Sequence, residues 1–413
     1  MTLQASPKSA PQPLAPPART GRAAAMPASA GLSVDVVRSR AGFDALEAEW
    51  NALFQRCGRG SAVYQAFNWN RHWADAYLAS TDDCSLAILA MRQAGTLVAV
   101  WPLVLTRMLG ARLVEWMGCP VSQYGDVLIA PEADTSAVLA AGWAAIRTTL
   151  RADALHLRKV RADAHIAPLL RTHAASVTFR TEAPCLDIAG APDLATFETR
   201  YSSKARKNRR RLARRLADLG EVRFEHLRDC PEAGAAAREA VLLRQRTLAE
   251  TGRVSIAMQD ERYARFFAAA AGGHQPCGTR VTRILVGGRL AASSIDITAH
   301  GHRAAHLIAH DLAFDACGPG VSMIGDWLRS AFEDRVAVLD LLAPAHTYKW
   351  DWADAAMQVC DYAVATSALG RAVVVPCLAN LRPRVKTAVE RFARWRAGTH
   401  ARGDRARDDQ GKD

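Results

Sequence analysis

The chain has 413 residues, of which half are apolar and 23% are charged, a mixture typical of globular proteins. This length suits two domains better than one core, and no run of 18 apolar residues predicts a membrane-spanning helix. The net charge of +12 is concentrated in residues 202–217 and 366–413. This concentration argues against a basic surface spread over the whole protein, as a general nucleic-acid binder would have.

Two further features of the sequence bear on the cellular compartment in which the protein folds. Residues 1–31 are rich in Ala and Pro and lack the continuous apolar stretch of a secretory signal, so we expect a disordered tail. The nine cysteines are widely spaced and form no CxxC pair, which favours neither a disulfide framework nor a zinc site. We therefore expect a reducing, cytoplasmic environment and no bound metal.

The first half of the chain predicts a mixed set of strands and helices. The helix at 67–78 carries Trp69, Trp73 and Tyr77 at i, i+4 and i+8, a stripe that predicts core packing. Two apolar runs about Ala94-Gly95 predict a hairpin. The elements expected in chain order are a strand at 32–37, helices at 41–53 and 67–78, strands at 85–92, 96–105, 112–117 and 126–129, a helix at 135–150 and a strand at 154–160.

A similar order recurs in the second half. The expected elements are a hairpin of 282–286 and 290–298 about Gly287-Gly288, a strand at 306–310, a helix at 321–332 and a strand at 336–342. The repeat predicts an α/β (α+β) protein of two related lobes, each a mixed sheet flanked by helices. We expect the lobes at 32–183 and 184–366, joined near 182–193, with a basic helix and a helical segment at 235–250 inside the second.

A glycine-rich loop lies between the second lobe's strand at 306–310 and its helix. Gly318 and Gly320 allow close approach of the backbone to a ligand, and the amides that begin the helix suit a pyrophosphate. The loop lacks the Gly-Lys-Ser/Thr ending of a P-loop. A tight turn with no ligand is the alternative interpretation.

The strand at 336–342 runs into a cluster of polar and aromatic residues. Tyr348 could protonate a departing thiolate, and Lys349 could hold a phosphate or carboxylate. Ligands of open α/β sheets collect at such strand ends. The alternative is that Tyr348 and Trp350 only cap the core.

Four segments together resemble one family. They are the basic helix with its following Leu-Gly and strand at 201–224, the Gly-Pro-Gly-Val loop at 318–321, the Tyr-Lys block at 340–354, and Tyr124-Gly-Asp126 with Ile-Ala-Pro at 129–131. In this order they resemble the CelD-like acetyltransferases of cellulose and exopolysaccharide biosynthesis, over about residues 32–366. That family is similar to tandem GNAT proteins and, more remotely, to Fem peptidyltransferases.

The resemblance implies an acyl-CoA cosubstrate, with its phosphates at Gly318, Gly320, Val321 and Ser322. It also makes Asp126 a candidate for substrate binding. The sequence departs from the GNAT pattern at Asp315, where Gln or Arg is usual, and has no Glu at the usual base position.

Other residues near the usual base position are therefore candidates for the base. His310 and Asp311 lie nearest to the usual position, and Asp296 lies on the preceding strand. We take His310 and Asp311, with Tyr348, as the catalytic candidates.

The basic helix has eight cations and no acid between residues 202 and 217. Leu212 and Leu216 give it an apolar stripe. Its charge is interpreted either as a solvated face or as a site where Lys204, Lys207 and Arg211 hold an anionic sugar or lipid-linked acceptor. DNA binding is a third interpretation that no zinc or helix-turn-helix spacing supports.

The basic extension at 367–413 alternates apolar residues with Arg and Lys, and Pro376 and Pro383 interrupt it. It predicts an amphipathic helix that docks on the protein's own core or lies on an anionic membrane surface. The second case would place the protein at the periphery of the inner membrane, in association with a polysaccharide synthase.

The leading hypothesis is an N- or O-acyltransferase that acts on a sugar or an envelope or exopolysaccharide precursor. The alternative is a non-catalytic accessory protein of polysaccharide (cellulose) biosynthesis. We expect no nucleic-acid partner.

Overall fold

The computed structural model describes residues 31–78, 84–253, 255–272 and 278–381. The expected tail, except for Gly31, and the part of the basic extension beyond residue 381 lie outside these ranges. Within them, no helix combines the length and the apolar character that crossing a bilayer requires.

The N-terminal lobe contains most of the elements that the sequence predicts. The hairpin turns at Ala94 and Gly95, both with positive φ. The helix expected at 41–53 is two helices that meet near Ala45. The elements are β1 (Leu32–Val37), α1 (Arg40–Asp44), α2 (Glu47–Cys57), η1 (Gly60–Gln65), α3 (Phe67–Tyr77), β2 (Cys84–Leu86), β3 (Ile88–Gln93), β4 (Thr96–Trp101), β5 (Leu103–Met108), β6 (Ala111–Trp116), β7 (Leu128–Ile129), α4 (Thr135–Thr148), β8 (Ala154–Arg161) and α5 (Ala167–Thr172).

The C-terminal lobe begins with the second half of the long strand β9 (Ser176–Asp187). The hairpin at Gly287-Gly288 and the helix after the glycine loop are both confirmed. The elements are α6 (Leu194–Glu198), α7 (Ser203–Ala217), β10 (Val222–Arg228), α8 (Pro231–Glu250), α9 (Ile256–Gln259), α10 (Glu261–Ala271), β11 (Gly278–Val286), β12 (Arg289–Ala299), β13 (His302–His310), η3 (Leu312–Cys317), α11 (Pro319–Glu333), β14 (Val338–Asp340), α12 (Thr347–Trp350), β15 (Ala355–Ala365), η4 (Gly370–Val374) and η5 (Cys377–Leu381).

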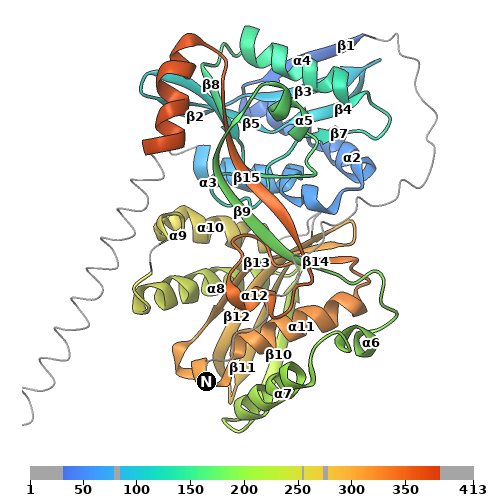
Figure 1. Ribbon diagram of the computed structural model, residues 1–413, viewed down its shortest axis with the longest axis vertical. Helices are drawn as coiled ribbons and strands as arrows, with labels where there is room; N and C mark the ends of the chain where they lie inside the picture. Colours follow the sequence, from blue (N-terminus) through green and yellow to red (C-terminus); the bar gives the residue numbers. More distant parts are fainter. Residues whose placement is uncertain (1–30, 79–83, 254, 273–277, 382–413) are drawn as a thin grey trace, which may run out of the picture.

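One mixed sheet of eleven strands runs through both lobes, in the order β10-β11-β12-β13-β14-β9-β15-β8-β6-β5-β2, and β1-β3-β4-β7 form a second sheet. The antiparallel pair β9 and β15 lies between the lobes, and β15 goes on to pair with β8 of the N-terminal lobe (Figure 1). The two lobes and the α/β fold class are as expected. The chain crosses from one lobe to the other along β9, the strand that contains the expected boundary between residues 183 and 184.

A shared hydrophobic core also joins the lobes. The predicted stripe of α3 is buried, and Trp69 packs edge-on against Phe266 of α10 with ring centroids 4.7 Å apart. Aromatic pairs at this spacing and angle stabilise a core beyond the area that they bury. The lobes are therefore held together by both sheet pairing and side-chain packing.

Candidate functional site

The sheet of the C-terminal lobe opens between β13 and β14. These parallel strands pair at only three positions, from His302/Val338 to Ala304/Asp340, and β14 then ends while β13 continues to His310. The register of β12 and β13 shifts in the same region, which leaves His306 as the extra residue on β13. β-Bulges of this kind often occur beside active sites. The edge of β13 that faces away from β12 is thus left without a β14 partner beyond Ala304.

The glycine loop lies beside this opening. Gly318 has φ 61° and ψ 52° and caps the N-terminus of α11, a left-handed conformation that favours glycine. The amides of Val321 and Ser322 donate to the carbonyl of Gly318 at 2.9 and 3.3 Å. Among the described residues, the amide of Gly320 has no acceptor. This amide and the positive end of the α11 dipole together suit an anion.

The basic helix α7 packs against the same loop. A Cβ on Gly318 would lie 2.9 Å from Cδ1 of Leu212, so the loop and the helix fit closely only because residue 318 is glycine. The Cys317 thiol also approaches the carbonyl of Arg215 at 3.6 Å. The apolar stripe of α7 therefore faces η3 and α11.

The cations of α7 divide into two groups. Arg209 is half-buried and stacks over the rings of Trp352 and Tyr201, at 3.5 and 3.9 Å from the ring centroids. Lys204, Lys207 and Arg211 are exposed, and the Asn208 side chain accepts a hydrogen bond from Arg211 at 2.8 Å. The binding of an anionic acceptor by these three side chains stays a prediction.

The block after β14 forms the short helix α12. Tyr348 is 44% exposed and its ring stacks on His346. Partial burial raises the pKa of the Tyr348 phenol, and the nearby charge of Arg244 opposes that shift. The phenol therefore remains protonated at neutral pH, as a general acid requires.

Lys349 points away from the surface. Its ammonium group donates to the carbonyl of Leu342 at 2.7 Å, and burial lowers its pKa to about 8. The structure thus places Lys349 beneath the turn after β14 instead of on an open phosphate-binding face. A contact between Lys349 and a substrate would require that the bond to Leu342 break.

A buried carboxylate at the end of β14 connects the two lobes. Asp340 accepts hydrogen bonds from the Tyr124 hydroxyl at 2.8 Å and from Arg161 at 3.3 Å, and lies 3.2 Å from Nε2 of His302. Burial acts to raise its pKa, but His302, Arg161 and Tyr124 outweigh that effect and hold the pKa below its ordinary value. The backbone amide of Leu342 also donates to this carboxylate at 2.8 Å, so the turn after β14 is tied to the N-terminal lobe.

The other predicted site residues have defined positions. His310 ends β13 and lies 3.0 Å from the Asp315 carboxylate, while Asp311 caps η3 by accepting from the amide of Ala313. Both residues are partly buried, and each has a partner of its own, so the structure does not choose between them as the base. Asp126 accepts from the amides of Val127, His165 and Ile166, which occupies both of its oxygens. The structure accordingly gives Asp126 a role in organising its loop.

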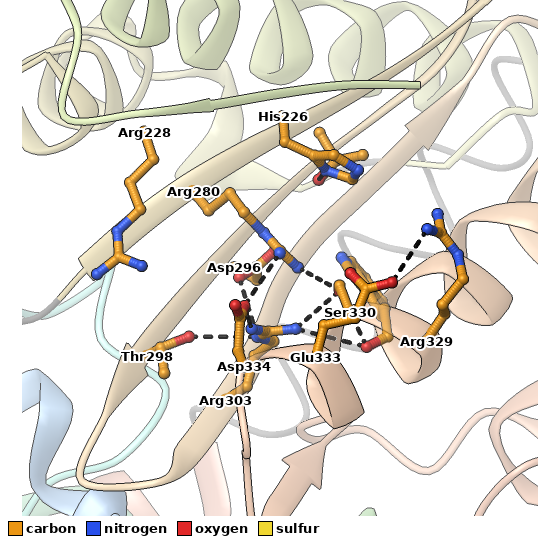
Figure 2. A network of polar contacts seen from close by, with 12 residues as sticks. His226, Arg228, Arg280, Asp296, Thr298, Arg303, Arg329, Ser330, Glu333 and Asp334 are labelled. Atoms are coloured by element: carbon orange, nitrogen blue, oxygen red, sulfur yellow. Dashed lines mark hydrogen bonds and ion pairs between the residues drawn. The ribbon is translucent and has the colours of Figure 1, made fainter. Parts of the chain in front are cut away.

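Asp296 is part of a network beneath α11. Asp296 lies 3.2 Å from Arg280 and 3.5 Å from Arg303. Both arginines also donate to Ser330 of α11 (Figure 2). The carboxylate is fully buried. Because these contacts enclose it, Asp296 has no access to an acceptor and is excluded as the base.

The sequence reasoning missed His306, which occupies the bulge beside the opening. Its ring lies between the Tyr64 hydroxyl at 3.2 Å and the Tyr263 hydroxyl at 3.5 Å. Burial, together with the charge of Lys159, lowers its pKa to about 3, so the imidazole is neutral. Only its place at the start of a predicted strand was visible in the sequence, and the tyrosines that face it are distant along the chain.

Residues 203–350 match the family described as an acetyltransferase (GNAT) domain. The C-terminal lobe is therefore similar to a GNAT acetyltransferase domain, a family whose members use acyl-CoA as the cosubstrate. No curated protein sequence matches the chain.

Several solved structures are similar to the chain at low sequence identity, and FemX shares its fold. The chain is similar to FemX, with a TM-score of 0.54 and 10% identity over 79% of this chain and 98% of that one. It is also similar to a tandem GNAT protein from the clavulanic acid biosynthesis pathway, with a TM-score of 0.44 and 14% identity over 81% of this chain and 99% of that one. A third similar structure is the C-terminal domain of a putative lysylphosphatidylglycerol synthetase from Agrobacterium fabrum, with a TM-score of 0.48 and 11% identity over 81% and 98% of the two chains.

Proposed function

We propose that the protein transfers an acyl group, most simply acetyl, from CoA to a hydroxyl or amine of a sugar or of an envelope or exopolysaccharide precursor. The observation that carries the proposal is the opening where β13 leaves β14, directly beside the N-terminus of α11. The amides on the open edge of β13 would stabilise the oxyanion that forms on the thioester carbonyl. The Gly320 amide and the α11 dipole would hold the pyrophosphate.

The reaction follows from these positions. The acceptor oxygen or nitrogen attacks the thioester carbon, and the C–S bond then breaks to release CoA thiolate. Tyr348 supplies a proton to that thiolate, since its phenol stays protonated at neutral pH. The acceptor loses its proton to His310, whose imidazole is paired with Asp315.

The acceptor is proposed to be anionic. The exposed cations Lys204, Lys207 and Arg211 lie on one side of α7 with no acidic residue in that helix, and the phosphate of a nucleotide-linked or lipid-linked sugar would neutralise them. A lipid-linked acceptor would bring the protein to the inner face of the cytoplasmic membrane, near a polysaccharide synthase.

The test is a thiol-release assay with acetyl-CoA and a panel of nucleotide-linked and lipid-linked sugars and amino sugars. We expect one acceptor class to raise thiol release well above the rate of acetyl-CoA hydrolysis. If acetyl-CoA binds but no acceptor in any class is modified, the proposed acceptor is wrong. If acetyl-CoA does not bind, the non-catalytic accessory role replaces the enzyme.

A further inference from the structure

A half-buried arginine of α8 lies near Tyr348, at the opening of the C-terminal sheet. Helix α8 packs against β13, and the hydroxyl of Thr247 donates to the carbonyl of His310 at 2.8 Å, where that strand ends. Arg244 comes one turn before Thr247 on the same helix and is partly buried. Its charge acts on the phenol of Tyr348 in α12. The guanidinium is therefore close to the group that, in the proposed function, protonates the CoA thiolate.

No carboxylate among the described residues neutralises Arg244. Within the part of the chain that the structure describes, its guanidinium makes neither an ion pair nor a hydrogen bond. The groups that act on its charge are the cation Arg253, just after α8, and the phenols of Tyr348 and Tyr263. Burial and the charge of Arg253 lower the pKa of Arg244, and the two phenols oppose that shift. Charged side chains that folding removes from water are normally paired, so this arginine is left in need of an anion.

The other groups around Tyr348 do not supply that anion. His346 stacks on the ring of Tyr348 with the centroids 6.1 Å apart, and burial and the charge of Lys349 lower its pKa. The carboxylate that acts on Lys349 is Asp340, which is buried and already paired with the N-terminal lobe. Tyr348 itself is 44% exposed, so a ligand can reach this place from solvent.

We propose that Arg244, assisted by Arg253, binds an anionic group on the acceptor sugar unit itself, a carboxylate or a phosphate close to the hydroxyl or amine that is acylated. The inference rests on the proposed function, which puts the acceptor beside Tyr348. Guanidinium groups recognise carboxylates and phosphates by paired, charge-assisted hydrogen bonds. The acceptor class is thereby narrowed to acidic sugars, namely uronates and sugar phosphates. The cations of α7 would contact a different part of the acceptor.

Protection of Arg244 from phenylglyoxal, which modifies arginine side chains, tests this site without requiring turnover. The rate of modification is followed by peptide mass spectrometry in the full chain, with inorganic phosphate, glucuronate or glucose at saturating concentration. Arg246, which is exposed on the same helix, is the internal reference. We expect phosphate or glucuronate to slow the modification of Arg244 about tenfold relative to Arg246, and glucose to have no effect. Protection by phosphate alone assigns a sugar phosphate, and protection by glucuronate alone assigns a uronate.

Substitutions test the same contact during turnover. Arg244→Gln should raise the KM of the acidic acceptor about tenfold or more and leave acetyl-CoA affinity intact, because a charge-assisted hydrogen bond is lost only on the acceptor side. Arg244→Lys keeps the charge and should recover part of that loss. Arg246→Gln makes the same change of charge on the exposed face of α8 and should behave as the wild type.

Two results would overturn the inference. One is the absence of protection by either anion, or equal protection of Arg244 and Arg246. The other is protection of Arg244 by acetyl-CoA together with a loss of acetyl-CoA affinity in Arg244→Gln, since the arginine would then bind the donor. These results are independent of the thiol-release panel. If no acceptor is acylated, the proposed function is wrong, whereas the protection of Arg244 still decides whether an anion binds there.

Discussion

The carboxylate of Asp340 provides the sharpest test of how the two lobes are joined. Asp340→Asn keeps the side-chain shape and removes the charge that Tyr124, Arg161 and His302 face at 2.8 to 3.3 Å. Hydrogen bonds to a charged group contribute about 1.5–3 kcal/mol each. Because Asn retains some acceptor capacity and Arg161 keeps its bonds to Asp163, we expect a loss of about 2–4 kcal/mol in the free energy of unfolding.

The loss is measured by urea unfolding, followed by tryptophan fluorescence. Asp163→Asn is the matched control, because this partly exposed residue also pairs with Arg161 and should cost less than about 1 kcal/mol.

The stabilisation by Asp340 should also depend on pH, because the folded protein lowers the pKa of this carboxyl group. Its contribution to the free energy of unfolding is complete above the ordinary pKa, near 4, and is lost as the pH falls through the lower folded-state pKa. The gap between the wild type and Asp340→Asn should accordingly shrink in acid. A variant within 0.5 kcal/mol of the wild type, on the order of the scatter for neutral substitutions, would refute this account of the joint.

Three further predictions concern the site. Gly320→Trp should abolish the acetyl-CoA binding that calorimetry measures. Gly320→Ala should retain it, because a Cβ at residue 320 would lie 3.8 Å from its nearest neighbour. Equal affinities of the two variants would show that the glycine loop does not bind acetyl-CoA. Tyr348→Phe should lower kcat by about 10²-fold with little change in acetyl-CoA affinity, and wild-type turnover would make Tyr348 a packing residue. Replacing Lys204, Lys207 and Arg211 together with Gln should raise the acceptor KM and leave acetyl-CoA binding intact. Loss of acetyl-CoA affinity in this triple variant would instead assign α7 to the donor, whose loop it contacts.

Local periodicity was enough to predict most elements of each lobe. The hairpins at Gly95 and Gly287-Gly288 and the buried stripe of α3 follow from turn chemistry and spacing alone. Strand β9 was not predicted, because Pro184 and several charged residues interrupt its apolar pattern. The strand forms because β14 and β15 pair with it on either side, and that pairing was not visible in a local window.

The parts of the site whose residues are adjacent in the sequence could be predicted. The loop from Gly318 to Ser322 starts a helix as expected, since glycine and proline punctuate the chain there. The role of Asp340 was not predictable, because Tyr124 and Arg161 are 216 and 179 residues away. The first-lobe motif was noticed, but Tyr124 is the residue in it that reaches the other lobe, whereas Asp126 binds backbone amides.

Titration of the full chain with acetyl-CoA in a calorimeter tests the central claim most directly. The account predicts saturable binding of one acetyl-CoA per chain at the C-terminal lobe, with competition by CoA. It also predicts that Gly320→Trp, once shown by circular dichroism to be folded, gives no heat of binding. Absence of binding to the folded wild-type chain, or undiminished binding to Gly320→Trp, would contradict the proposal that the opening beside α11 is an acyl-CoA site.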